Sequence, residues 1–110
     1  MTTYHLNAYR VIFETRKGEQ TFYNLRLADE NGLAAEVGLF HDIEEENIEQ
    51  LLKLGRIHPR KPLEVVPYVP KDCTAVRKTK RKEGIRFEQL SKKELKKVNG
   101  LVRDVQRGNL

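Results

Sequence analysis

Three alternating segments near the N-terminus decide the fold: YHLNAYRVIFET at residues 4–15, QTFYNLRLA at residues 20–28 and LAAEVGLF at residues 33–40. In each segment large apolar side chains recur at every second position, which is the period of a β-strand with two distinct faces. Gly18 and the Asn31–Gly32 pair lie between the segments and allow the positive φ of tight turns. The sequence therefore predicts an antiparallel three-stranded meander.

The alternation also assigns side chains to faces of this sheet. In the first segment Tyr9, Val11 and Phe13 share one face, and Leu6, Ala8 and Ile12 share the other. In the third segment one set of apolar residues is expected in line: Leu33, Ala35, Val37 and Leu39. One face of the sheet is apolar enough to require a cover.

A helix over residues 42–54 is the predicted cover. Asp42 and Glu45 have the spacing of an N-terminal capping box, and the glutamates at residues 44–46 suit the positive end of a helix dipole. Gly55 is a typical C-terminal stop. Its apolar stripe consists of Ile43, Ile48, Leu51 and Leu52.

Residues 63–69, LEVVPYV, are predicted to be extended, and Pro67 predicts an edge position because proline lacks a ladder donor. Residues 1–70 then form an α+β body, with an antiparallel sheet of three or four strands covered by one helix. Residues 71–110 are predicted to be a basic arm followed by a C-terminal amphipathic helix. Ser91 and Glu94 form a capping box at the start of that helix. Its apolar residues recur at spacings of three and four: Leu95, Val98, Val102 and Val105.

The stretch between these two parts, residues 71–90, is the least globular in composition. It is either a hairpin that turns near residues 82–84 or an extended arm that orders on a partner.

Charge is distributed unevenly along the chain. Lys and Arg number 21 against 16 Asp and Glu, for a net charge of +5. Residues 1–57 hold six basic and ten acidic side chains, whereas residues 58–110 hold fifteen and six. A heavily charged thermophilic surface explains the number of charges, but their separation favours a folded body joined to a half that binds polyanions.

Two clusters of cations dominate the basic half, one in the arm and one on the C-terminal helix. A phosphate backbone relieves their mutual repulsion and releases counterions when it binds, which is the main source of affinity for nucleic acids. The prolines around residues 60–61 hold two further cations in an extended loop. The predicted nucleic-acid-binding residues are Arg60, Lys61, Arg77, Lys78, Lys80, Arg81, Lys82, Arg86, Lys92, Lys93, Lys96 and Lys97.

Aromatic residues of the sheet offer a second mode of binding. Proteins that bind single strands stack bases on exposed rings, and Tyr9 and Phe22, with Arg10 and Arg26 as neighbours, are candidates. No RNP-type motif accompanies them, and the sheet segments carry net negative charge. Packing in the core is therefore the favoured interpretation of both rings.

The chain carries no signature of catalysis or of a cofactor site. Its three histidines lack the i, i+4 spacing of a metal pair, Cys73 is the one cysteine, and no phosphate-cradling glycine loop is present. We expect no enzyme activity, no metal and no small-molecule substrate. There is no membrane span and no apolar leader at the N-terminus, so we expect a cytoplasmic protein.

In overall character the chain resembles small basic ribosomal proteins of thermophilic archaea. The resemblance rests on residues 71–98, where the run VRKTKRKEGIRFEQLSKKELKKV joins a mildly acidic body to a lysine-rich helix. The order of three strands and a helix also resembles the AP2/integrase type of DNA-binding domain. The tryptophans of that type are absent, and the sheet would present Glu14, Glu19 and Glu36 to DNA.

The sequence thus predicts a non-catalytic structural protein of a ribonucleoprotein, which contacts rRNA through its basic half and lies beside neighbouring ribosomal proteins. Two alternatives remain at this point. One is a double-stranded DNA-binding regulator or viral protein. The other is an adaptor that docks on another protein through its C-terminal helix.

Overall fold

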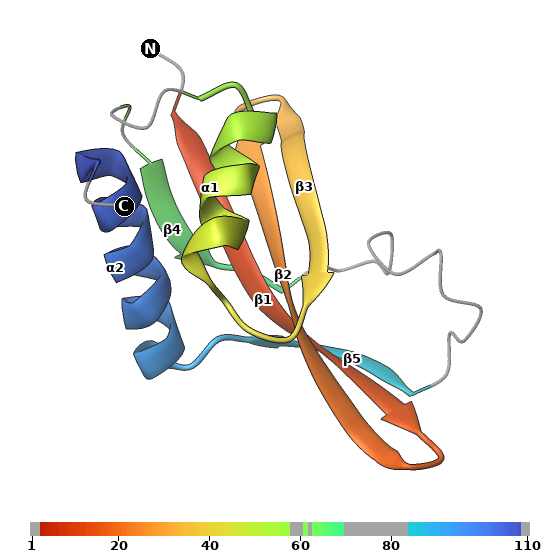
Figure 1. Cartoon of the computed structure of the whole chain (residues 1–110). Coiled ribbons are helices and arrows are strands. Elements are labelled where there is room, and N and C mark those ends of the chain that lie inside the picture. The colour runs from red at the N-terminus through yellow and green to blue at the C-terminus, as the bar shows by residue number, and fades with distance from the viewer. Residues whose placement is uncertain (1–2, 58–60, 62, 70–83, 109–110) are drawn as a thin grey trace.

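The structure is a computed structural model that describes residues 3–57, 61, 63–69 and 84–108. These residues form one mixed sheet with two helices on the same side of it (Figure 1). In chain order the elements are β1 (Tyr4–Thr15), β2 (Gly18–Asp29), β3 (Gly32–Phe40), α1 (Glu45–Leu54), β4 (Leu63–Pro67), β5 (Ile85–Gln89) and α2 (Lys92–Arg107). The predicted α+β class is confirmed.

β1 is the central strand of the sheet. It pairs along its whole length with antiparallel β2, whose other edge pairs with antiparallel β3. Two short strands share the remaining edge of β1: β4 lies parallel to Tyr4–Ala8, and β5 lies antiparallel to Tyr9–Phe13. The prediction of a purely antiparallel sheet is therefore wrong. α1 returns the chain to the starting end of β3, so β4 must run in the same direction as β3 and β1.

The main core lies between the sheet and the two helices. Leu6, Leu25 and Leu27 are fully buried there against α1, and the same cluster includes three valines of α2. The face assignment predicted for the first strand is confirmed. Most of the apolar stripe of α2 is buried in this core, and Leu95 is partly buried against it. The buried valines are Val98, Val102 and Val105.

α1 begins three residues later than predicted. Its N-cap is Glu44, which makes no side-chain capping hydrogen bond, and Asp42 accepts a hydrogen bond from Asn47 through its backbone oxygen instead. Ile43 explains the difference, because it is buried in the core and the chain stays extended around it. Gly55 ends the helix with a helical φ of −75°, and a Cβ there would overlap Leu27. The glycine is thus needed for close packing on the sheet.

β3 departs from regular alternation at two places. The pairing with β2 skips Ala34 and Val37, so each is an extra residue, and Gly38 adopts a φ of +107° beside the second irregularity. Leu33 and Leu39 are therefore 51% and 36% exposed and do not follow the core-facing residues of this strand. The prediction that the four apolar residues of this strand lie in line is wrong.

α2 confirms the predicted C-terminal helix. The Ser91 hydroxyl accepts a hydrogen bond from the Glu94 backbone, and the Glu94 carboxylate accepts one from the Ser91 backbone. Gly108 ends the helix in the left-handed conformation, with a φ of +73°. The predicted capping box at the start of this helix is therefore confirmed.

Candidate nucleic-acid interface

The net charge of the chain lies entirely outside the described residues. Seven of the 21 basic residues and two of the 16 acidic residues are there, which leaves fourteen of each sign in the described part. The folded body is thus electrically neutral overall, and any affinity that it has for a polyanion must come from where its charges lie.

Six of the twelve predicted binding residues lie outside the described residues, in the loop near residue 60 and in the arm: Arg60, Arg77, Lys78, Lys80, Arg81 and Lys82. The structure does describe the two points at which residues 70–83 join the body. Val69 follows β4 and Gly84 precedes β5, and the Gly84 carbonyl accepts a hydrogen bond of 2.8 Å from the Glu14 backbone. Both ends of this basic segment are therefore attached along one edge of β1.

Four of the described candidates form one surface at the start of α2. Lys92, Lys93, Lys96 and Lys97, which we call the α2 lysine face, are all exposed and lie opposite the buried valines. None forms an ion pair with a carboxylate of the described residues. Other cations of the body do have partners. Lys53 lies 3.2 Å from Glu49, for example. The α2 lysine face is therefore a cluster of ammonium groups available to phosphates.

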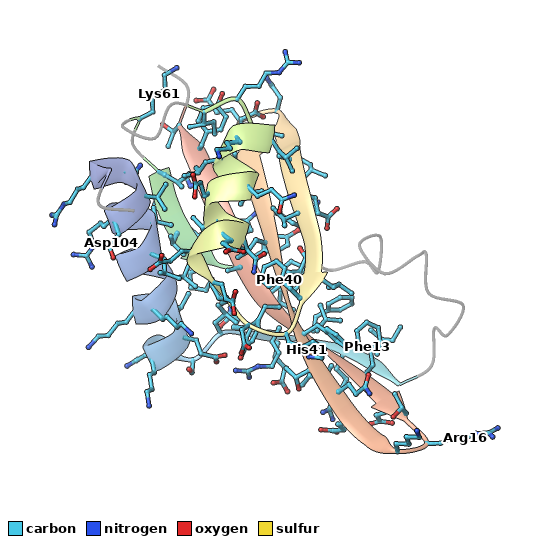
Figure 2. All side chains as sticks on the ribbon, viewed as in Figure 1. Phe13, Arg16, Phe40, His41, Lys61 and Asp104 are labelled. Atoms are coloured by element: carbon cyan, nitrogen blue, oxygen red, sulfur yellow. The ribbon has the colours of Figure 1, made fainter. Side chains whose placement is uncertain are left out.

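The other two described candidates lie elsewhere. Arg86, on β5, donates a 2.9 Å hydrogen bond to Glu19, and both side chains are about half exposed. Such an exposed pair contributes little to stability and can be exchanged for a phosphate. Lys61 is exposed, and its carbonyl accepts a hydrogen bond from Gln106 near the C-terminal end of α2. Figure 2 shows Lys61 near the C-terminal end of α2, whereas the lysine face lies at the N-terminal end of the same helix.

One hollow adjoins the lysine face. It has a volume of about 340 Å³ and separates the first turn of α1 from α2. Its lining residues are Ile43, Glu44, Glu45, Glu46, Lys97 and Leu101. Three carboxylates make this side unfavourable for phosphate, so Lys92, Lys93 and Lys96 are the better phosphate contacts of the face.

A polar cluster that sequence reasoning missed fixes the start of α2 on the sheet. Arg10 of β1 donates to Glu94 and also pairs with Glu88 at 3.3 Å. Burial alone would raise the pKa of Glu94, but hydrogen bonds from Tyr23, the Ser91 backbone and Arg10 outweigh it and lower the pKa to about 2. The Glu94 hydrogen bond also raises the pKa of Arg10. The lysine face thus projects from a helix end that is held rigidly.

The signal for this cluster was present in the sequence. Arg10 occupies an even position of β1, on the face of Leu6 and Ala8, and a cation on a core face requires a partner. The same position shows that Arg10 is not a neighbour of the Tyr9 ring. The predicted pairing of these two residues in one stacking site is therefore wrong.

The opposite face of the sheet carries a group of aromatic rings, and both described helices pack on the other side. We call Tyr9, Phe13, Phe22, His41, Tyr68 and Phe87 the aromatic face. Tyr9 lies 5.7 Å from Tyr68 and 5.9 Å from Phe87, between ring centroids. Tyr9 is fully buried, as the core interpretation predicted, but Phe22 is only partly buried.

Polar groups without partners accompany these rings. Among the described residues, Tyr9 Oη, Asn24 Oδ1 and Arg26 Nε are buried and make no hydrogen bond. Burial raises the pKa of Tyr9 to about 12, against the opposing charge of Arg26. Arg26 also lies 5.7 Å from the Tyr68 ring centre, in a cation–π contact. This face therefore differs from an ordinary apolar core in its unused hydrogen-bonding capacity.

No protein-family model, no curated protein and no solved structure matches the chain. Within the described ranges, no helix is long and apolar enough to cross a membrane. The same part of the chain contains no group of three or more His, Cys, Asp or Glu residues arranged to hold a metal ion.

Proposed function

We propose that this protein is a non-catalytic RNA-binding component of a ribonucleoprotein, with ribosomal RNA as its partner. The observation that carries the proposal is the α2 lysine face: four exposed ammonium groups, without partners in the described body, on a helix that is docked through its other side. Because the described body has no net charge, the lysine face is a local excess of positive charge on it.

The mechanism is neutralisation of phosphates. Each phosphate that contacts a lysine releases condensed counterions, and the fixed helix limits the loss of backbone freedom on binding. Contacts of this kind position a protein on RNA and carry little sequence information, so specificity comes from the shape of the RNA. The cations of the arm would add to the same electrostatic contact.

The salt dependence of RNA binding tests the proposal. We compare the wild type with a variant that carries Lys92→Gln, Lys93→Gln, Lys96→Gln and Lys97→Gln. The matched control removes four exposed cations elsewhere on the body: Arg16, Lys17, Lys53 and Arg56, each changed to Gln. In a plot of the logarithm of affinity against the logarithm of salt concentration, the slope for the lysine variant should become shallower by up to about 3. The control should change the slope much less.

An equal change of slope in both variants would show that only total charge matters and would contradict a lysine-face contact. Sedimentation of cell lysate, with and without nuclease, then tests the ribosomal assignment. The protein should sediment with ribosomal subunits and be released by nuclease. A protein that stays in the same heavy fraction after nuclease treatment is held by protein contacts, which contradicts the proposal.

A further inference from the structure

We infer that the aromatic face binds the unpaired bases of single-stranded RNA by stacking. This inference rests on the proposed function and names the form of RNA that it requires. The lysine face contacts phosphates only, whereas the aromatic face would contact the bases themselves.

The first observation is a series of rings on the side of the sheet away from the two described helices. The ring centroids of Phe13 and Phe22 are 5.4 Å apart, and those of Phe22 and His41 are 4.5 Å apart. Phe13 and Phe22 are partly exposed, and His41 is exposed. Figure 2 shows Phe13 and His41 close together on the sheet, between Phe40 and the hairpin tip at Arg16. Because every base has a π-face, such rings form a stacking site for any sequence.

The second observation is the unused hydrogen-bonding capacity on the same face. Asn24 is only 1% exposed, and its amide nitrogen donates to Glu36 at 3.1 Å, but its Oδ1 has no partner in the described residues. Arg26, two residues further along β2, also leaves Nε without a partner. Both atoms are buried, so they show incomplete hydrogen bonding beneath this face and are not themselves the contacts to a base.

The third observation concerns the distribution of charge over the two faces. The net negative charge of the sheet segments counted against stacking, but the strand register places Glu14, Glu19 and Glu88 on the helix-covered side. On the aromatic side the described strands carry Glu36, which contacts Asn24, and Glu64, which lies 3.4 Å from His5. Both are nearer the N-terminal half of β1, away from Phe13 and its neighbours.

The fourth observation is where the basic segment is attached. Tyr68, immediately before Val69, packs on Tyr9, and Ile85, immediately after Gly84, pairs with Phe13. Both attachment points of residues 70–83 therefore lie beside the aromatic face. Six of those fourteen residues are Lys or Arg. This positively charged segment joins the body at both of these points, whereas the stacking site itself consists of the described rings alone.

The test compares two RNA probes with the same backbone. One is an oligoadenylate, and the other is the abasic strand of equal length and charge. The wild type should bind the oligoadenylate about tenfold more tightly, which corresponds to the stacking of one base. The double variant Phe22→Leu, His41→Leu removes two rings but keeps apolar area, and it should bind both probes equally.

One further variant serves as a matched control, and another repeats the test with a single substitution. Phe40→Leu makes the same change on the helix-covered side, where Phe40 packs against the main core. It should keep the tenfold ratio. His41→Leu alone changes an exposed side chain and so leaves folding intact. It should reduce the ratio even if the double variant fails to fold.

A ratio near one for the wild type, or an unchanged ratio in both ring variants, would overturn the stacking inference. So would tighter binding of an oligoadenylate–oligouridylate duplex than of the single strand. These failures are distinct from failure of the proposed function. If the stacking inference alone is wrong, the lysine-face variant still weakens binding to both probes and still changes the salt slope.

Discussion

The two faces of the sheet have the same strands but opposite chemistry. The helix-covered face is built from aliphatic side chains, and its one internal cation, Arg10, is paired with Glu88 and Glu94. The aromatic face has rings in partial contact with solvent, and it leaves polar atoms of Tyr9, Asn24 and Arg26 without partners. The helix-covered face is thus the more completely packed and paired of the two, and the aromatic face is the one that we propose for binding.

The largest expected difference between the faces is in core packing. Leu25→Ala removes a fully buried side chain under α1 and should lower the free energy of unfolding by about 2–5 kcal/mol. Phe22→Leu, three residues earlier on β2 and on the opposite face, should lower it by less than about 1.5 kcal/mol. Urea denaturation of both variants measures the two values. Equal losses would break the distinction between the faces.

The second test concerns the paired charge at the start of α2. Glu94→Gln should destabilise the protein at neutral pH by about 2 kcal/mol, because it weakens hydrogen bonds to a charged group. In the wild type the folded-state pKa of about 2 lies below that of an unfolded chain. The stabilisation is therefore complete above about pH 5 and is lost as the pH falls toward 2.

Thermal melting across this pH range distinguishes the two proteins. The melting temperature of the wild type should fall steeply in acid, and that of the variant should fall less. Parallel curves would show that Glu94 does not provide the expected contact between α2 and the sheet.

The last comparison involves two glycines. Gly55 faces Leu27 closely, so Gly55→Ala should destabilise by about 1–3 kcal/mol through overpacking. Gly100 lies inside α2 with nothing near its Cβ position, so Gly100→Ala should stabilise by up to about 1 kcal/mol. Denaturant titration measures the change in the free energy of unfolding for each variant. Opposite signs of the two changes would confirm the distinction between packed and open positions. A stabilising Gly55→Ala would contradict the packing of α1 on the sheet.

Much of the fold follows from local sequence, since alternation and capping signals are local properties. The meander, the C-terminal helix and its capping box at Ser91 were all predictable in this way. The direction of β4 was not, because a five-residue strand has the same pattern in either direction. The two extra residues in β3, Ala34 and Val37, could not be predicted for a similar reason. A bulge depends on pairing with a neighbour, and the strand itself gives no sign of it.

The candidate site was predictable only in part. The exposure of the α2 lysine face followed from helical spacing, and the structure agrees. The pairing of Arg86 with Glu19 depends on the alignment of β5 and β2 on either side of β1, which residues 67 positions apart do not reveal. The sequence offered Tyr9 and Phe22 as stacking candidates but favoured the core interpretation, because a partly buried ring and a core ring have the same sequence pattern.

The central claim is tested most directly by removing the cations of the arm and measuring how the RNA affinity of the protein depends on salt. Arg77, Lys78, Lys80, Arg81 and Lys82 are changed together to Ala, and the affinity for single-stranded RNA is measured over a series of salt concentrations. The slope of log affinity against log salt should become shallower by up to about 3.5, while the melting temperature stays close to that of the wild type. An unchanged slope, or a wild-type protein that binds no RNA even at low salt, would contradict the account.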